Sequence, residues 1–456
     1  MASDSKHSID MLNGPILGKL SSLALPIALS SILQQLFNSA DTAVAGKFAS
    51  SQAMAAVGSN ASVINLIITL FVGLSIGANV VVASFIGRNE HHRIRKAINT
   101  SMIVAVVSGV FLTAFGILVA PQILKLISCP PDVIGMATEY LRIYFLGMPF
   151  VMIYNFGSAI LRADGDSRRP LYALIVAGTV NVFLNLYFVI VWNMAAAGVG
   201  LATTISNIIS SMMILTFLLR EKSYLRLDLR KRLEFDKGIF RKMVAIGLPA
   251  GLQGAVFSLS NVVIQSAINS FGSDAVAGSA AAQNFEFICW FMINGFGQAA
   301  TTFTSQNFAA GDRARCRKIY LRATTAGLSL TLAMSLIFFI GRYPFLHIFT
   351  SNDVVMKYAL TRLCVVALFE LLTGTYEIPG ACLRGMGMSM IPAVETLIGS
   401  CLLRILFVMT IFPHHHSFTL LMAVYPMSWV ITGIIVTSTY LLTREKIFDR
   451  MSKHIS

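Results

Sequence analysis

Long apolar segments follow one another along the whole chain, with short polar segments between them. Twelve of them are long enough to cross a bilayer as helices, which takes about 20 residues each. Their approximate bounds are 17–44, 55–82, 97–120, 135–160, 169–192, 195–219, 241–268, 277–307, 319–345, 355–382, 391–413 and 418–442. The pattern predicts an all-α integral membrane protein with twelve transmembrane helices, because a spanning segment must satisfy its own backbone hydrogen bonds in lipid.

Basic residues are concentrated in alternate loops, after spans 2, 4, 6 and 8, and in the C-terminal tail. These positions are Arg88, Arg93, Arg95, Lys96, Arg162, Arg168, Arg169, the bases of the segment Arg220–Lys242, Arg313, Arg315, Arg317, Lys318, Arg322, Arg444, Lys446, Arg450 and Lys453. Because cytoplasmic loops carry the excess of Lys and Arg, both termini are expected to be cytoplasmic, in a multi-pass protein of the cell (inner, cytoplasmic) membrane. Arg142 and Arg362 lie in the first two turns of spans 4 and 10 and are expected to snorkel outward.

The two halves of the chain repeat. AILRADGDSRRP at 159–170 matches ACLRGMGMSMIP at 381–392, an offset of 222 residues that also superimposes Tyr154 on Tyr376. Each half has an even number of spans, so two six-helix lobes related by a pseudo-two-fold axis along the membrane normal are expected. The predicted parts are an N-terminal tail (1–15), an N-terminal lobe (16–219), a cytoplasmic linker (220–240), a C-terminal lobe (241–443) and a C-terminal tail (444–456).

Composition agrees with a membrane protein. The 456 residues are 55% hydrophobic and 12% charged, whereas soluble domains carry about 25% charged residues. The net charge of +14 lies in short loops, so membrane orientation explains it better than a nucleic-acid partner, and none is expected. The six cysteines show no CxxC pair, and the three adjacent histidines 414–416 lie in an outer loop without nearby carboxylates; neither group predicts a metal site.

One acid lies deep in the first span. Gln34, Asn38 and Asp41 are spaced at i, i+4 and i+7 and therefore share one helix face. A charge at membrane depth costs roughly 2.5–3.5 kcal/mol on insertion scales. Two interpretations remain open: a structural polar seam between helices, or an ion or proton site inside a transporter.

Further polar residues in the first half favour the second interpretation. They are Asn155 on span 4, Asn181 and Asn185 on span 5, and Thr203 and Asn207 on span 6. If these faces converge, they form a hydrated pocket around a single carboxylate. Asp41 would then load and release a proton near neutral pH.

The second half has a different set of candidates. Gln265 lies on span 7, Glu370 and Glu377 share one face of span 10, and Arg404 lies deep in span 11. Glu377 and Arg404 either form a buried neutral pair with a structural role or take part in substrate or ion binding. No GxxxxGK[ST] or HExxH motif occurs, so no enzyme activity and no cofactor are expected, and energy would come from an ion gradient.

Four segments carry a family resemblance: LPIALSSILQQLFNSADTAVAGKF, GLSIGANVVVASFIGR, LRADGDSRRP and LRGMGMSMIP. They resemble the multidrug and toxic compound extrusion (MATE) family, most closely its bacterial DinF-like branch, over about residues 15–445. The resemblance implies export of organic, often cationic, compounds in exchange for protons or sodium ions. It also implies that Asp41 is the coupling aspartate, with Gln34, Asn155, Asn181 and Thr203 as its polar neighbours.

The chain departs from that pattern at two positions. The branch often has a second aspartate where this chain has Asn185, so Asp41 would carry the coupling of the N-terminal lobe alone. Sodium-linked relatives place a glutamate where this chain has Phe257, which weakens sodium coupling there. Our own inference is that Glu370 or Glu377 substitutes for it.

The sequence hypothesis is a secondary active antiporter. It exports amphipathic organic cations in exchange for protons, by rocking of its two lobes, with Asp41 as coupling carboxylate; its partners are small molecules and membrane lipids, and a monomer is expected. The alternatives are a sodium-coupled metabolite exporter, a flippase for an amphiphilic lipid-linked intermediate, or a membrane enzyme or scaffold. An enzyme is disfavoured because all eight histidines lie in termini or loops.

Overall fold

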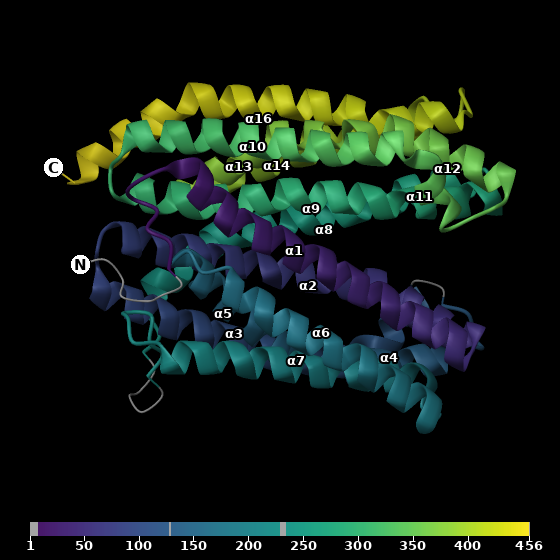
Figure 1. Ribbon diagram of the computed structural model, residues 1–456. Coiled ribbons are helices and arrows are strands. Elements are labelled where there is room, and N and C mark those ends of the chain that lie inside the picture. Colours follow the sequence, from purple (N-terminus) through teal and green to yellow (C-terminus); the bar gives the residue numbers. More distant parts are fainter. Residues whose placement is uncertain (1–7, 127–128, 229–233, 456) are drawn as a thin grey trace. The chain divides into compact units, whose positions relative to one another are not determined.

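The computed structural model describes residues 8–126, 129–228 and 234–455, and these are almost entirely helical, without a β-strand (Figure 1). The first half contains α1 (Ile16–Val44), η1 (Ala45–Ala49), α2 (Ser51–Gly87), α3 (His91–Leu126), α4 (Ile134–Leu146), α5 (Met148–Ala163), α6 (Arg168–Leu186), η2 (Tyr187–Val191) and α7 (Ala195–Arg220). The second half contains α8 (Lys237–Asn269), α9 (Ser273–Ala309), α10 (Arg313–Ile340), α11 (Arg342–His347), α12 (Asp353–Val365), η3 (Ala367–Thr373), α13 (Gly374–Gly385), α14 (Met390–Thr396), η4 (Leu397–Leu402), α15 (Leu403–Thr410) and α16 (Phe418–Ile455).

The predicted fold class is confirmed. Within the described residues, nine helices are long and apolar enough to cross a membrane, and the pair α4 and α5, bent by 46°, makes a tenth. α9 and the broken run α12–η3–α13 occupy the two remaining predicted spans. The predicted C-terminal tail continues α16 as helix to Ile455. Residues 1–7 of the predicted N-terminal tail and Arg230, Lys231 and Arg232 of the predicted linker lie outside the described residues.

The sequence repeat is also a repeat of backbone conformation. α2 and α9 both have 37 residues and begin 222 residues apart, at Ser51 and Ser273. The loop glycines of the repeated motif, Gly165 and Gly387, have φ of +94° and +84°. Glycine adopts this left-handed conformation at no steric cost, so the offset reproduces a turn as well as a sequence.

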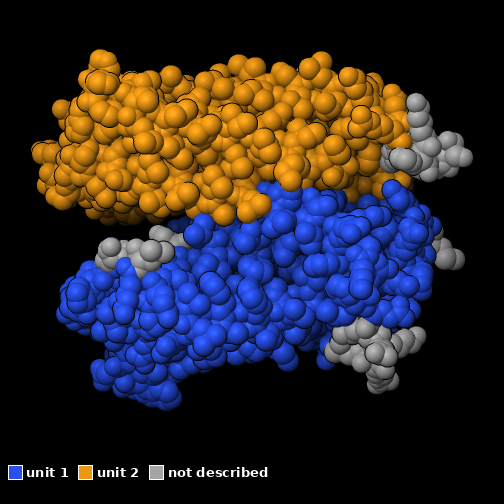
Figure 2. Space-filling model, turned by 180° about the vertical axis from the view of Figure 1, so that it is seen from behind, with its two compact units in different colours: residues 1–10, 29–251 blue, residues 11–28, 252–456 orange. Residues whose placement is uncertain are grey.

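The chain forms two compact units, coloured separately in Figure 2. The first holds the chain up to Asp10 and Leu29–Gly251, and the second holds Met11–Ala28 and Leu252 onward. The divisions therefore fall inside α1 and α8, and the lobe boundaries expected from the linker 220–240 stay a prediction.

Small residues let helices approach closely in each unit. In the first unit, a Cβ on Gly73 of α2 would lie 2.4 Å from Cα of Gly251 in α8, so the two backbones touch. In the second unit, a Cβ on Gly295 of α9 would lie 2.8 Å from the carbonyl oxygen of Ala24 in α1. Close backbone contact through small residues is the usual way helices associate in lipid.

Candidate functional site

Asp41 belongs to a ring of hydrogen-bonded side chains from α1, α6 and α7. Its Oδ1 accepts a hydrogen bond from Asn185 Nδ2 at 2.5 Å, and its Oδ2 accepts one from Thr203 Oγ1 at 3.1 Å. Asn185 Nδ2 also reaches Asn181 Oδ1 at 3.2 Å, and Asn181 Nδ2 reaches Thr203 Oγ1 at 3.4 Å. The four side chains therefore form a closed hydrogen-bonded ring, and Asp41 is its one carboxylate.

The ring is enclosed, and its members other than Asp41 are neutral. Asp41 is 5% exposed and Asn185 is 0% exposed. Among the described residues, no Lys, Arg or His forms an ion pair with Asp41. A buried carboxylate without a cationic partner is costly unless donors stabilise it or a proton neutralises it. The ring supplies the donors, and a proton on the carboxylate would also neutralise its charge.

Local sequence explains why the ring forms. Asn181 and Asn185 are one helical turn apart on α6, so both amides face the same way. A Cβ on Gly178 would lie 1.8 Å from Cε2 of Phe37, so glycine allows α1 to approach α6 at this point. Phe37 is one turn before Asp41, and that approach brings the carboxylate within reach of both amides.

The remaining residues of the predicted pocket do not join the ring. Gln34 and Asn38 are exposed on α1. Asn155 donates to the carbonyl oxygen of Val151 in its own helix at 2.8 Å. The structure thus brings together Asp41 and three of its predicted neighbours, and leaves these three apart.

The suggested pairing of Glu377 with Arg404 is wrong. Glu377 accepts from Arg384 Nη2, seven residues later on the same helix, and Arg384 Nη1 also reaches Gln253 Oε1 at 3.4 Å. Residues seven apart lie on one face of a helix. Arg384 is therefore close enough to Glu377 to pair with its carboxylate in place of Arg404.

Arg404 is held instead by aromatic rings. Its guanidinium carbon lies 4.6 Å from the ring centroid of Tyr425 and 5.4 Å from that of Phe257, and its Nε donates to Ser428 Oγ at 2.9 Å. Of the other candidates in the second half, Glu370 is buried in η3. Gln265 donates to Asn269 Oδ1 at 3.0 Å on its own helix.

The expectation that Arg362 snorkels outward is also wrong. Arg362 is 2% exposed, and its Nε and Nη2 donate to the two carboxylate oxygens of Glu286 at 2.7 and 2.8 Å. Ser279 accepts a third bond from it at 2.8 Å. This pair was not predicted from the sequence. The signal for it was an acid early in span 8 and a base early in span 10, which could have neutralised each other inside the membrane.

A second acidic cluster lies in the loop between α5 and α6, outside the membrane-spanning segments. Asp166 accepts the backbone N–H groups of Arg168 and Arg169 at 3.0 Å and caps α6. Arg169 bridges Asp166 to Glu221. Asp164 accepts from the Tyr224 hydroxyl at 2.5 Å, and burial raises the pKa of its carboxyl to about 7.

A buried carboxylate ringed by neutral polar groups, within a helical membrane protein built from two repeats, is the arrangement of a membrane transporter. Residues 26–187 and 249–410 each match the MatE family model, and the two matches start 223 residues apart, within one residue of the offset of the internal repeat. The chain therefore belongs to the MatE family and is a multi-pass membrane transporter.

Curated relatives cover most of the chain. The probable multidrug resistance protein YoeA of Bacillus subtilis is 25% identical over 385 residues, 83% of either chain. The probable multidrug resistance protein NorM of Thermotoga maritima is 27% identical over 389 residues, 83% of this chain and 82% of its own. The multidrug export protein MepA of Staphylococcus saprophyticus is 20% identical over 394 residues, 85% of either chain.

Solved structures share the fold. A MOP superfamily transporter from Pyrococcus furiosus superimposes with a TM-score of 0.87 at 22% identity, covering 96% of this chain and 97% of that one. A MATE transporter in complex with MaD5 gives a TM-score of 0.88 at 20% identity, covering 97% and 99%.

Proposed function

We propose that this protein exports amphipathic organic cations from the cytoplasm in exchange for protons, with Asp41 as the group that carries the proton. The observation that carries the proposal is the ring: one carboxylate held by neutral donors, with no ion-pair partner among the described residues. Relatives named as multidrug resistance or export proteins support the choice of cargo.

The ring favours a proton over a sodium ion as the coupling ion. Asn185 and Thr203 both present donors to the carboxylate. Sodium binding would call for several oxygen atoms turned toward the ion, as other hard cations require in proteins. A proton needs only the carboxylate oxygen itself, and the neighbours adjust their hydrogen bonds around it.

Thr203 provides that adjustment. Its hydroxyl oxygen lies 3.1 Å from Asp41 Oδ2 and 2.9 Å from the carbonyl oxygen of Val199, and it has one proton to donate. When Asp41 is ionised, the hydroxyl donates to the carboxylate. When Asp41 is protonated, the carboxyl group donates to the hydroxyl oxygen, which turns its own proton toward Val199.

Exchange follows from competition between the two charges. An ionised Asp41 favours a cation in the N-terminal unit, and a protonated Asp41 does not. Transport is coupled only if each ligand prefers a different state of the protein. With Asn185 in place of a second acid, Asp41 is the one titratable member of the ring, and one proton per cycle is expected from this site.

Proton flux triggered by a dye cation in proteoliposomes tests the proposal. Wild type should take up the dye and release protons, and Asp41→Asn should abolish both. Asp274→Asn removes an exposed carboxylate at the start of α9 and is the matched control. A full signal from Asp41→Asn would overturn the proposal. Dye transport that persists without a pH gradient and disappears without a sodium gradient would show that the coupling ion is sodium and not the proton.

A further inference from the structure

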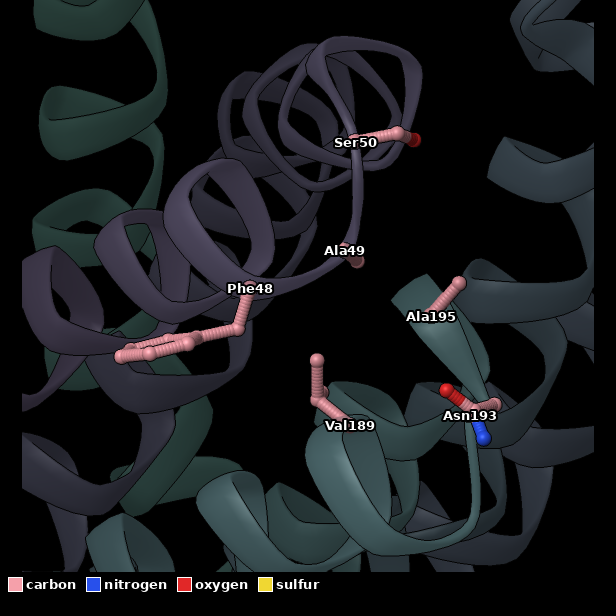
Figure 3. A pocket seen from close by; sticks show the side chains of 6 residues that line it. All are labelled: Phe48, Ala49, Ser50, Val189, Asn193 and Ala195. Carbon is pink, nitrogen blue, oxygen red and sulfur yellow. The ribbon is translucent and has the colours of Figure 1, made fainter.

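A small pocket lies in the first unit at the end of α1 beyond Asp41. It is lined by Phe48, Ala49, Ser50, Val189, Asn193 and Ala195 and has a volume of about 170 Å³ (Figure 3). That volume corresponds to about six water molecules at about 30 Å³ each. Pockets for drug-sized ligands measure about 300–1,000 Å³, so this pocket suits water and not the transported compound.

The pocket and the Asp41 ring share the same helix faces. Residues four apart lie on one face of a helix, and each element of the ring reaches the pocket in such steps. Along η1 and α1, the steps from the pocket to the ring are Ala49, Ala45 and Asp41. Along α7 they are Ala195, Val199 and Thr203. Along η2 and α6 they are Val189 and Asn185. Ala195 and Thr203 are eight positions apart, which corresponds to a rise of about 12 Å along the helix axis.

Along these steps, small apolar side chains lie between the pocket and the ring, and we call them the apolar layer. They are Ala45 and Val199, both 0% exposed, and Val189, which is 2% exposed and also lines the pocket. None is larger than valine. Thin hydrophobic constrictions of this kind control the passage of water and ions by wetting and drying.

The backbone around this layer departs from regular α-helix. Ala45 begins η1 and Val189 lies within η2, and both segments are π-helical. Such turns are rare and occur often at functional sites. At the rim, Asn193 and Ala195 have φ of +53° and +47°. Asparagine adopts this left-handed conformation readily, whereas it costs alanine about 1–2 kcal/mol. Strain of this type collects at functional sites.

The ring also offers an acceptor for water. The side-chain oxygen of Asn185 is buried and accepts no hydrogen bond from the described residues. Its amide nitrogen is already engaged with Asp41 and Asn181. Buried polar atoms of this kind are ordinarily satisfied by water in a roomy polar site.

We propose that the pocket at Ala49 and Ala195 is the outer port through which the coupling proton reaches Asp41, by a route inside the first unit that the cargo does not use. A hydronium ion in the pocket gives up its proton along water that enters when the apolar layer opens. One O–H bond breaks on the hydronium ion and one forms on a carboxylate oxygen of Asp41, and neutral water remains. The proposal rests on proton coupling through Asp41 and adds where the proton enters.

Reversible blocking of the port is the test. Ala49→Cys, in a background without the two partly exposed cysteines (Cys129→Ser, Cys364→Ser), is labelled from outside with a membrane-impermeant trimethylammonium thiosulfonate, and complete labelling is checked by mass spectrometry. Dye-triggered proton flux should fall to the level of Asp41→Asn and return after reduction, while dye binding to the purified protein stays unchanged. Ser417→Cys, exposed in the outer loop before α16, is the control and should keep full flux.

Val199 gives an independent measurement. Val199→Phe should block proton flux without labelling, and Val199→Ala should allow a proton leak in the absence of dye. Met212→Phe, exposed on the same helix, is the size-matched control. Full flux through completely labelled Ala49→Cys, or no effect of either Val199 variant, would overturn the port. Full flux in Asp41→Asn would instead overturn proton coupling itself, so the two failures are distinguishable.

Discussion

At the scale of the residue, the hydroxyl of Thr203 tests whether a neutral donor of the Asp41 ring matters for transport. It donates to the carboxylate at 3.1 Å, and a hydrogen bond to a charged group contributes about 1.5–3 kcal/mol. Thr203→Val keeps the shape and removes the donor, so proton-coupled dye transport should fall by about tenfold or more. Thr203→Ser keeps the donor and should retain most activity; equal loss in both variants would mean that packing, not the hydrogen bond, matters.

The buried pair of Arg362 and Glu286 makes a separate prediction about stability. Removing one partner leaves an unpaired buried charge, so Glu286→Gln and Arg362→Met should each destabilise the protein by about 3–5 kcal/mol. Replacing both, as Glu286→Leu with Arg362→Met, should recover much of that loss. Thermal melting in detergent measures the three variants. A double variant as unstable as the sum of the singles would show that the pair does not act as one unit.

The same residues show how far sequence could go. Asp41, Asn181, Asn185 and Thr203 were identifiable because polar side chains in apolar spans are costly and tend to converge. The partners of Glu377 and Arg362 were not identified, because helical periodicity gives the face of a residue but not which charged group, on its own helix or on a neighbouring one, pairs with it. Glu377 found its partner within its own helix, and Arg362 found one on α9.

At the scale of the element, the twelve apolar spans predicted the helices but not their interruptions. α1 and α6 end in π-helical turns, and span 10 is broken by η3. Gly147 and Pro149 signal the bend between α4 and α5, because proline suits a helix start. The π-helical turns have no comparable signal, since packing of whole helices decides where an extra residue is inserted.

The loop between α5 and α6 should make stability depend on pH. The folded pKa of Asp164 is raised from 3.8 to about 7 by burial, so the folded state binds the proton more tightly than the unfolded state. The stabilisation is complete below about pH 4 and is lost as pH rises through about 7, with a total of about 4 kcal/mol. Glu221 and Asp166 raise the pKa further, whereas Tyr224 and Arg169 lower it.

Melting curves of wild type and Asp164→Asn between pH 4 and 8 measure this dependence. The melting temperature of wild type should decline relative to that of the variant across this interval. Asp132→Asn, exposed in the loop before α4, should keep the wild-type slope. Parallel curves for wild type and Asp164→Asn would show that the loop carboxyl titrates as an exposed one does.

At the scale of the whole molecule, the repeat made the architecture predictable. A constant offset of 222 residues links both the sequence motif and the left-handed glycines Gly165 and Gly387. The compact units could not be predicted from it, because their divisions fall inside α1 and α8 and not in the polar linker. A polar segment marks where the chain leaves the membrane, whereas the units reflect which helices pack together.

Orientation in the membrane is the last prediction, and the side of the membrane on which the pocket at Ala49 opens depends on it. The bases in alternate loops predict that both termini lie in the cytoplasm. Ser417→Cys before α16 should therefore react with an impermeant maleimide on intact cells, and Lys222→Cys after α7 only after lysis; both positions are exposed. The proton gradient of a cell membrane points inward, so a port on the outer side would let protons drive export. The reverse labelling pattern would turn the pocket at Ala49 toward the cytoplasm, and the pocket would then be the exit of the coupling proton and not its entry.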